Sequence, residues 1–238
     1  MSGPLLALDT GSPLVSVALA RDGAVVAARS VEQERSSIRL LEMVREVLDE
    51  AGIGAGDLGV LGGIAVLRGP GSFTGLRIGL ATALGLHQAL GVPATALPSL
   101  PVLAAAAATT EDRGGIVIAV VDALRGDWSA QAFAAGRPLG GMELVPGPEL
   151  PRLAGGGAAG AAMAAMVTGF GVSRLAGLPG WPADLRLVEP GPLAPAAALL
   201  AAQPETVWDP ALLTAAIYSR PPAITLPRPR AAAPASVP

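Results

Sequence analysis

The chain reads VLGGIAVLRGPGSFTGLRIGLATALGLHQAL from residue 60 to residue 90. The apolar run at residues 60–67 predicts a buried β-strand, and the stretch from about Thr74 to Leu90 predicts a helix with almost no polar face. The glycine loop GPGSFTGLRIG, residues 69–79, joins the two. A strand, a glycine-rich turn and a helix in this order favour an α/β protein.

The segments on either side extend this pattern. Before it, we expect a β-meander at residues 5–8, 14–20 and 24–31, with a hairpin signal at Asp22-Gly23. A helix over residues 38–51 follows, with a hydrophobic and a charged side. After the quoted stretch, we expect a strand at residues 92–97 and a helix that starts at Pro98.

The pattern then restarts. Residues 116–121 form a second apolar run that ends at Asp122, as residues 5–8 end at Asp9. Further segments are expected as hairpin partners at residues 128–134 and 139–145, a strand within 163–171 and a helix at 194–202. We therefore expect two related subdomains, each with a mixed β-sheet flanked by helices, at residues 1–110 and 111–226. The Pro/Ala-rich residues 227–238 are expected to be a disordered tail.

The composition excludes several kinds of chemistry. The 238 residues include no Cys, no Lys and a single His, His87. A thiolate nucleophile, a Cys-ligated metal, a P-loop lysine and a metal site built on several histidines are therefore excluded. The formal net charge of -3 lacks the basic excess of a protein that binds nucleic acid alone, so we expect any role with RNA to depend on a partner.

The segment Asp9-Thr10-Gly11-Ser12 is the first candidate site. A carboxylate at a strand end, followed by a hydroxyl and a glycine turn, can hold a metal-bound water or a phosphate. A polar turn in which Asp9 caps backbone N–H groups is an equally weighted alternative. An aspartic protease would need a second such segment, but Asp122-Ala123-Leu124 lacks the Thr-Gly pair.

The glycine loop is the second candidate site, because its backbone N–H groups and the helix start can face an anion. A tight turn capped by Ser72 or Thr74 is the structural alternative. No catalytic residue and no metal ligand are predicted. The candidate nucleotide- or phosphate-binding residues are Asp9, Thr10, Gly11, Gly69, Gly71, Ser72, Thr74 and Gly75.

The helix after the loop is apolar nearly all round, so it must be covered on more than one side. Gly75, Gly79 and Ala83 recur every four residues and permit close helix approach. The helix is either central in its own domain or covered by another subunit, and we favour the second interpretation. His87 near its end is expected to be a capping or core residue.

The run Gly69–Gly79 resembles the signature of the TsaB (YeaZ-like) family, the dimerisation subunit of the tRNA threonylcarbamoyladenosine machinery. Further matching segments are Leu6-Ala7-Leu8-Asp9-Thr10, Gly91-Val92-Pro93, Val121-Asp122-Ala123 with Arg125-Gly126-Asp127, and Ala216-Ile217-Tyr218-Ser219-Arg220-Pro221. The resemblance implies an actin/Hsp70/sugar-kinase-like (ribonuclease H-like) fold of two related subdomains.

The resemblance also implies a function in tRNA modification. Such a chain is a non-catalytic accessory subunit that binds and orders a TsaD-type catalytic subunit, works with a TsaE-type ATPase, meets tRNA only through the complex and forms a homodimer when alone. ATP or ADP with Mg would bind at the junction of the complex. TsaD holds its metal through two histidines on its first helix, whereas residues 36–51 contain no His.

The two helices after the meander would form the subunit interface. The interface residues so implied are Ile38, Leu41, Arg45, Leu48, Gly75, Arg77, Ile78, Gly79, Thr82 and Ala83. On this basis, Gly79→Leu is expected to break pairing and to leave the isolated fold less affected.

Two other functions remain open. An ATP-dependent small-molecule kinase or ATPase of the same fold would use Asp9, the glycine loop and Asp122, and a peptidase is the weaker alternative. We expect a cytoplasmic protein: Gly91 and three prolines interrupt the long uncharged stretch, and Asp9 interrupts the first apolar run.

Overall fold

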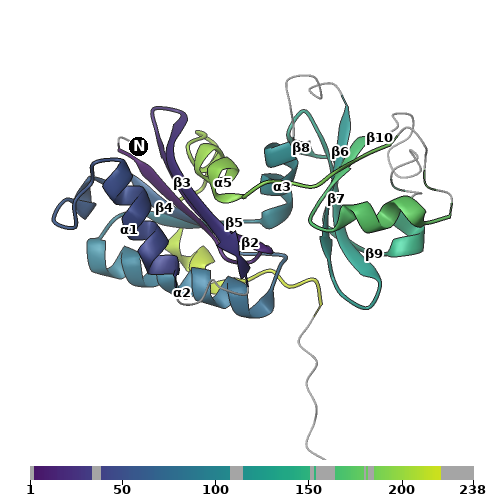
Figure 1. Ribbon diagram of the computed structural model, residues 1–238, viewed down its shortest axis with the longest axis horizontal. Coiled ribbons are helices and arrows are strands. Elements are labelled where there is room, and N and C mark those ends of the chain that lie inside the picture. Colours follow the sequence, from purple (N-terminus) through teal and green to yellow (C-terminus); the bar gives the residue numbers. More distant parts are fainter. Residues whose placement is uncertain are drawn as a thin grey trace, which may run out of the picture.

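The computed structural model describes residues 3–33, 39–107, 115–150, 153, 164–179, 181 and 185–220. It contains two mixed β-sheets flanked by helices, which confirms the predicted fold class (Figure 1). Ile38 and the expected tail at residues 227–238 lie outside the described residues.

The first sheet has the strand order β3-β2-β1-β4-β5. Its strands are β1 (Leu5–Asp9), β2 (Leu14–Arg21), β3 (Ala24–Glu32), β4 (Gly63–Leu67) and β5 (Ala94–Leu97). The first three strands form the predicted antiparallel meander, and β4 and β5 run parallel to β1. We call this sheet, with the helices α1 (Leu40–Glu50) and α2 (Phe73–Leu90), the first lobe.

Alternation along β1 gives the first sheet two apolar faces. Leu6 and Leu8 pack under α1 and α2, whereas Leu5 and Ala7 point to the opposite side. Since successive side chains of a strand point to opposite faces, a fully apolar strand must be covered on both. This explains why all five residues of β1 are buried.

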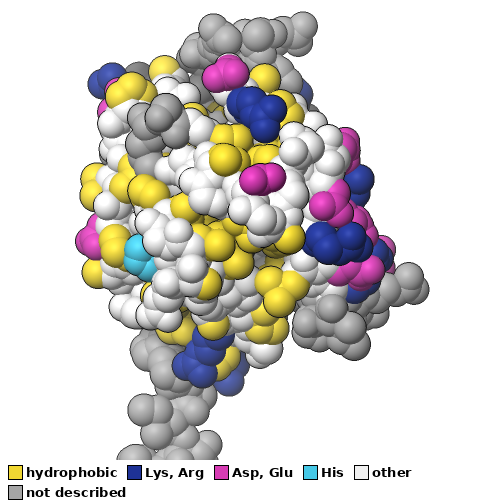
Figure 2. All heavy atoms as spheres, turned by 90° about the vertical axis from the view of Figure 1, so that its left-hand side faces the viewer, with side chains coloured by type: hydrophobic (Ala, Val, Ile, Leu, Met, Phe, Trp, Pro, Cys, Tyr) yellow, Lys and Arg dark blue, Asp and Glu magenta, His cyan; other side chains and the backbone are white. Residues whose placement is uncertain are grey.

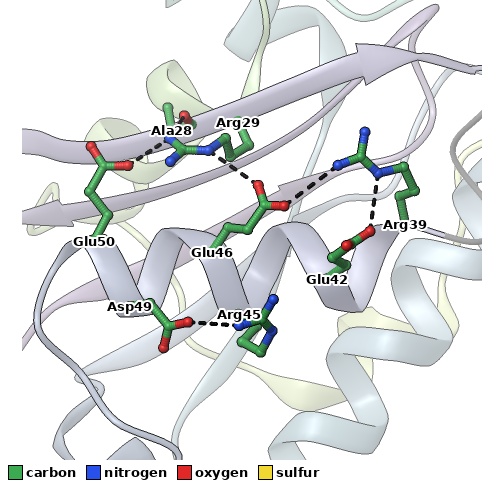
Figure 3. Close-up of polar contacts among 8 residues, drawn as sticks. All are labelled: Ala28, Arg29, Arg39, Glu42, Arg45, Glu46, Asp49 and Glu50. Carbon is green, nitrogen blue, oxygen red and sulfur yellow. Dashed lines mark hydrogen bonds and ion pairs between the residues drawn. The ribbon is translucent and has the colours of Figure 1, made fainter.

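One flank of α1 is tied to the outer strand β3 by charge. Arg29 of β3 forms ion pairs with Glu46 (3.3 Å) and Glu50 (2.6 Å), and Arg39 bonds both Glu42 and Glu46 (Figure 3). Leu41 and Arg45 are exposed and lie outside this network, and Arg45 pairs with Asp49 one turn further along α1 at 3.0 Å (Figure 3). The ion pairs therefore leave Leu41, a large exposed apolar residue, without a charged partner beside it.

The second sheet repeats the first. Its strand order is β11-β10-β6-β7-β8, and β9 also pairs with β7. Its strands are β6 (Ile116–Asp122), β7 (Asp127–Ala134), β8 (Arg137–Pro138), β9 (Glu143–Pro146), β10 (Ala164–Thr168) and β11 (Arg186–Val188). As in the first sheet, the leading strand pairs antiparallel with the next strand in the chain, β7, and parallel with a later strand on its other side, β10 here and β4 in the first sheet. We call this sheet the second lobe; its topology confirms that the two subdomains are related.

Two helices lie between the sheets, α3 (Ser99–Ala107) and α5 (Ala194–Ala201) (Figure 1). The α3 helix contacts the second sheet, and α5 lies on β1 and β2 of the first. Ala197 and Ala198 of α5 pack close to Ala18 of β2, since small side chains let a helix approach a sheet closely. The expected subdomain boundary at residue 110 stays a prediction, but the chain after residue 193 returns to the first lobe.

The apolar surface of α2 is covered in part by its own chain: five of its residues are buried, whereas Ile78, Leu84, Leu86 and Leu90 are partly exposed. One side contacts β1, β4 and β5, and a 3-10 helix, η6 (Pro210–Thr214), covers another side with Leu213 in the same core. The sequence did not indicate this second cover. In the described part of the chain, no helix is long and apolar enough to cross a membrane.

Candidate functional site

A cavity of about 440 Å³ lies between the two lobes, where the strand–Asp segments of both lobes end. Its lining residues are Gly11, Ser12, Pro13, Gln33, Pro70, Gly71, Ser72, Ser99, Leu103, Val121, Asp122, Leu124, Phe170, Gly171, Arg174 and Leu193. Both candidate segments of the first lobe contribute to this wall. In an α/β protein the carboxyl ends of the strands are the expected place for a ligand.

Asp9 does not line the cavity. Its carboxylate is fully buried, with Oδ1 accepting from the N–H groups of Gly11 (2.9 Å) and Ser12 (3.3 Å) and Oδ2 accepting from the Ser12 hydroxyl. Burial raises the pKa of Asp9 from 3.8 to about 6, because desolvation outweighs the hydrogen bonds from Ser12 and Gly11, which lower it. Asp9 thus stabilises the turn that follows it by capping backbone N–H groups, which agrees with the alternative of a polar turn.

The glycines of the loop let α2 approach that turn. A Cβ on Gly75 would lie 1.9 Å from the Thr10 carbonyl oxygen, and one on Gly79 would lie 2.2 Å from Thr10 Oγ1. The Thr10 hydroxyl donates to the Gly75 carbonyl at 2.7 Å. Only glycine fits at these two positions, so their presence is explained by packing within the chain.

The N-terminus of α2 is also bonded within the chain. Ser72 is its N-cap, with its hydroxyl accepting from the Gly75 N–H, and the Ser72 N–H donates to the Gly11 carbonyl at 2.8 Å. Gly69 has φ of +109°, and a Cβ there would meet the Ile217 carbonyl oxygen at 2.1 Å. The glycine loop therefore lies between the Thr10-Gly11 turn and the C-terminal segment.

Asp122 occupies the equivalent strand end of the second lobe and does line the cavity. Its Oδ1 accepts from the Leu124 N–H at 2.7 Å, the same local turn that Asp9 makes with Gly11. Its Oδ2 pairs with Arg174 at 2.8 Å, and the Arg174 guanidinium lies 5.3 Å from the Trp128 ring. Unlike Asp9, this carboxylate is partly exposed.

Several anion-binding donors near the cavity already have carboxylate partners in the same chain. Gly11 and Ser12 N–H groups bond Asp9, and Arg174 pairs with Asp122. The N–H groups of Gly171 and Ser173 bond the Glu189 carboxylate at 2.8 and 3.2 Å. An incoming phosphate would have to displace these internal partners, which makes the cavity a poor preformed phosphate site.

The predicted nucleotide-site residues are therefore divided in space. Gly11, Gly71 and Ser72 reach the cavity wall, Asp9, Thr10 and Gly75 are buried behind it, and Thr74 is exposed. The polar cavity residues that the sequence did not indicate are Gln33, Ser99 and Arg174. Arg174 lies in a segment without clear periodicity, so no sequence signal pointed to it.

The predicted interface residues also fall into two groups. Leu48, Gly75, Gly79 and Ala83 are buried within the first lobe. For these four, burial leaves no surface for a partner, and a leucine at Gly79 would disrupt the fold of the chain itself, contrary to the expectation above. The residues on which a partner could act are Leu41, Arg45, Arg77, Ile78 and Thr82.

Two further candidates, a metal-ligand cluster and His87, can be checked in the described part of the chain. No group of three or more His, Cys, Asp or Glu side chains there could hold a metal ion. The His87 Nδ1 lies 2.7 Å from the Val92 carbonyl oxygen, and since a carbonyl only accepts, this nitrogen donates. His87 thus has one of the two structural roles expected for it, capping the end of α2.

Comparison with known proteins relates this fold to tRNA-modification proteins. The family model described as "TsaD: tRNA N6-adenosine threonylcarbamoyltransferase" matches residues 26–135. The tRNA threonylcarbamoyladenosine biosynthesis protein TsaB of Escherichia coli is 36% identical over 123 residues, 52% of each chain. The protein of the same name from Haemophilus influenzae is 35% identical over 116 residues, 49% of this chain and 48% of that one. The chain thus aligns with about half the length of these curated relatives.

A solved structure extends the likeness to nearly the whole fold. YeaZ from Pseudomonas aeruginosa is 33% identical, with a TM-score of 0.64, and the match covers 84% of this chain and 90% of that chain. This agreement includes both lobes, the topology of which is repeated here. On this sequence identity and coverage, the chain belongs to the TsaB (YeaZ) family.

Proposed function

We propose that this protein is the non-catalytic subunit of a tRNA N6-threonylcarbamoyladenosine transferase complex in the cytoplasm, where it binds and orders a TsaD-type catalytic subunit. Its curated relatives carry the name tRNA threonylcarbamoyladenosine biosynthesis protein TsaB. A TsaE-type ATPase and tRNA join through the complex.

The use of the glycine loop carries this proposal. Gly71, Gly75 and Gly79 seat the loop and α2 against Thr10 and Gly11, so the close approach of these segments accounts for the glycines without a ligand. Asp9 is buried behind the cavity and Asp122 is paired with Arg174. An ATP-dependent kinase of this fold would need these carboxylates free to face Mg-nucleotide, so the geometry favours a supporting role over phosphoryl transfer.

We propose that the partner binds a surface on α1 and α2, which we call the docking face. Its residues are Leu41, Arg45, Arg77, Ile78 and Thr82. Leu41 is 63% exposed although it is a large apolar residue. Figure 2 looks onto the side of the molecule that the first lobe forms, where hydrophobic side chains are spread over the middle and charged side chains of both signs gather along one edge. The docking face itself combines exposed apolar surface with two arginines, and arginine is enriched at protein interfaces.

The relation to TsaD supports the choice of partner. The TsaD family model matches residues 26–135, which include both α1 and α2. A TsaD-type chain would therefore carry the same two helices on the same kind of sheet. Two chains with equivalent surfaces can pair about an approximate two-fold axis, and the same surface serves a homodimer when the partner is absent.

Leu41→Asp tests the docking face. A charge at the centre of an apolar contact should weaken binding to the TsaD-type subunit at least about tenfold, which corresponds to about 1.4 kcal/mol. Because Leu41 is exposed, the variant should unfold at the same temperature as the wild-type chain. The dissociation constant would be measured by titration calorimetry with the purified subunits.

Leu139→Asp is the matched control. Leu139 is another exposed apolar residue, 48% accessible, but it belongs to the second lobe. It should bind the partner within about twofold of the wild-type chain. If Leu41→Asp and the wild-type chain bound the partner with equal affinity, the partner would not bind at the docking face.

A further inference from the structure

The C-terminal segment at residues 215–220 joins three parts of the molecule. Ile217 donates its N–H to the Arg68 carbonyl of the first lobe at 2.6 Å, and the Arg68 side chain donates to the Ala215 carbonyl at 3.3 Å. These two bonds fix the start of the segment beside the glycine loop. The Ile217 carbonyl oxygen lies so close to residue 69 that only a glycine fits there.

The end of the same segment is fixed to the second lobe. The hydroxyls of Ser129 and Ser219 lie 2.7 Å apart, and Arg220 forms an ion pair with Asp127. Ser129 and Asp127 are both residues of β7, and Ser129 is buried. The segment therefore crosses from one lobe to the other within four residues, and we call residues 215–220 the strap.

Tyr218 stands between these two attachments and reaches α2. Its ring lies 5.1 Å from that of Phe73, and its hydroxyl accepts from Arg77 Nε at 3.4 Å. The Arg77 guanidinium lies 3.9 Å from the Phe73 ring. Arg77 belongs to the docking face, so the strap is in direct contact with the surface proposed to bind the partner.

The shortness of the strap makes these contacts interdependent. Ile217 and Ser219 are two residues apart, and two residues of extended chain span at most about 7 Å. If the lobes separate by more than a few ångströms, either the Arg68 bond or the Ser129 bond must break. Tyr218 would then lose one of its two fixed neighbours and its position on Phe73 and Arg77.

From this arrangement we infer that the strap couples the spacing of the two lobes to the docking face, so that the partner binds preferentially when the strap is attached to the second lobe. The inference rests on the proposed docking of a TsaD-type subunit. Because binding and conformation are linked, a partner that contacts Arg77 and Tyr218 stabilises the attached strap. Release of the strap lowers the affinity for the partner by the same factor.

Asp127→Asn tests this coupling from the second lobe, away from α1 and α2. It removes the charge that holds Arg220, and we expect the affinity for the full-length TsaD-type subunit to fall about fivefold. Glu143→Gln removes a carboxylate charge from exposed β9 of the same sheet and should change the affinity less than twofold. Equal affinities of Asp127→Asn and Glu143→Gln would overturn the inference.

A reversible lock provides a second test. The chain contains no Cys, so Ser129→Cys with Ser219→Cys introduces its only thiols, and the hydroxyl separation of 2.7 Å is compatible with a disulfide. The oxidised double variant should bind the partner at least as tightly as the wild-type chain and about fivefold more tightly than its reduced form. Equal binding of both forms would contradict the coupling.

Hydrogen exchange separates failure of the strap from failure of the docking proposal. In the wild-type chain without a partner, the Ile217 N–H should be protected, and Asp127→Asn should exchange it at least about threefold faster. If the strap loosens in this way but the wild-type chain does not bind the TsaD-type subunit, the docking proposal fails and the coupling inference falls with it. Unchanged exchange in Asp127→Asn would refute the strap itself.

Discussion

The turns after β1 and β6 begin alike and end differently. In each, an Asp at the strand end accepts a backbone N–H from two residues further on, Gly11 in one case and Leu124 in the other. The first turn is covered by α2 and its Asp9 is fully buried. The second turn opens onto the cavity, and its Asp122 pairs with Arg174 in partial contact with solvent.

The difference lies in what each turn supports. The first turn packs against α2, whose outer side we propose as part of the docking face. Gly75 and Gly79 lie so close to Thr10 that no methyl group could be added at either glycine. The second turn supports no such helix among the described residues. A repeated strand–Asp unit has thus become a packing site in one lobe and an exposed ion-paired loop in the other.

The largest expected effect is on Gly75, where the first turn and α2 touch. Gly75→Ala would place a Cβ against the Thr10 carbonyl oxygen and should destabilise the chain by about 3 kcal/mol or more. Gly85→Ala in the same helix meets no atom within 4 Å and should stabilise it by about 0.5–1 kcal/mol. Denaturant unfolding of both variants measures the two effects, and equal stabilities would refute the close seating of α2.

The second effect concerns pH and Asp9. Its pKa in the folded chain is raised to about 6, so folding takes up a proton between pH 3.8 and 6 and the free energy of unfolding rises as the pH falls through this range. Relative to Asp9→Asn, the wild-type chain should gain about 2 kcal/mol between pH 7 and pH 4. A stability difference that does not vary with pH would show that Asp9 is solvated.

The third effect concerns the hydroxyl that links the turn to the helix. Thr10→Val keeps the shape but removes the bond to the buried Gly75 carbonyl, which should cost about 1–2 kcal/mol. Thr74→Val, on the exposed side of α2, should change the stability by less than about 0.5 kcal/mol. Thermal unfolding of the pair compares them, and a larger loss in Thr74→Val would argue against the proposed packing role.

The smallest effect is expected in the second turn. Asp122→Asn breaks a pair with Arg174, whose side chain is 61% exposed, so the loss of stability should stay below about 1 kcal/mol. Urea unfolding of Asp122→Asn beside the wild-type chain measures it. A loss of stability as large as that of Gly75→Ala would mean that the two turns contribute equally to the stability of the chain.

Much of the fold was readable from the sequence because the buried strands are uniformly apolar. The meander, the glycine-loop helix and the restart near Ile116 were all predicted, and the structure places strands and helices there. The short strands β8 and β11 were not predicted, because two or three residues carry no detectable period. The cover that η6 gives to one side of α2 was not predicted, because nothing local to α2 indicated it. A partner subunit on the rest of this helix stays a prediction.

The site was less predictable, for a physical reason. Glycines that free the backbone for an anion and glycines that admit a neighbouring chain look the same in a sequence. Gly75 and Gly79 belong to the second kind, which only the distance to Thr10 decides. The strap was visible as a segment resembling a family motif, but its contacts with Asp127 and Ser129 join residues about 90 positions apart.

The central claim, a non-catalytic subunit that activates a partner, is tested most directly by reconstituting tRNA threonylcarbamoylation from purified TsaD-type and TsaE-type subunits, with and without this chain. We expect modified adenosine only when the chain is present, and much less when the Leu41→Asp variant replaces it at the same concentration. Product formation at an equal rate without the chain would contradict the account.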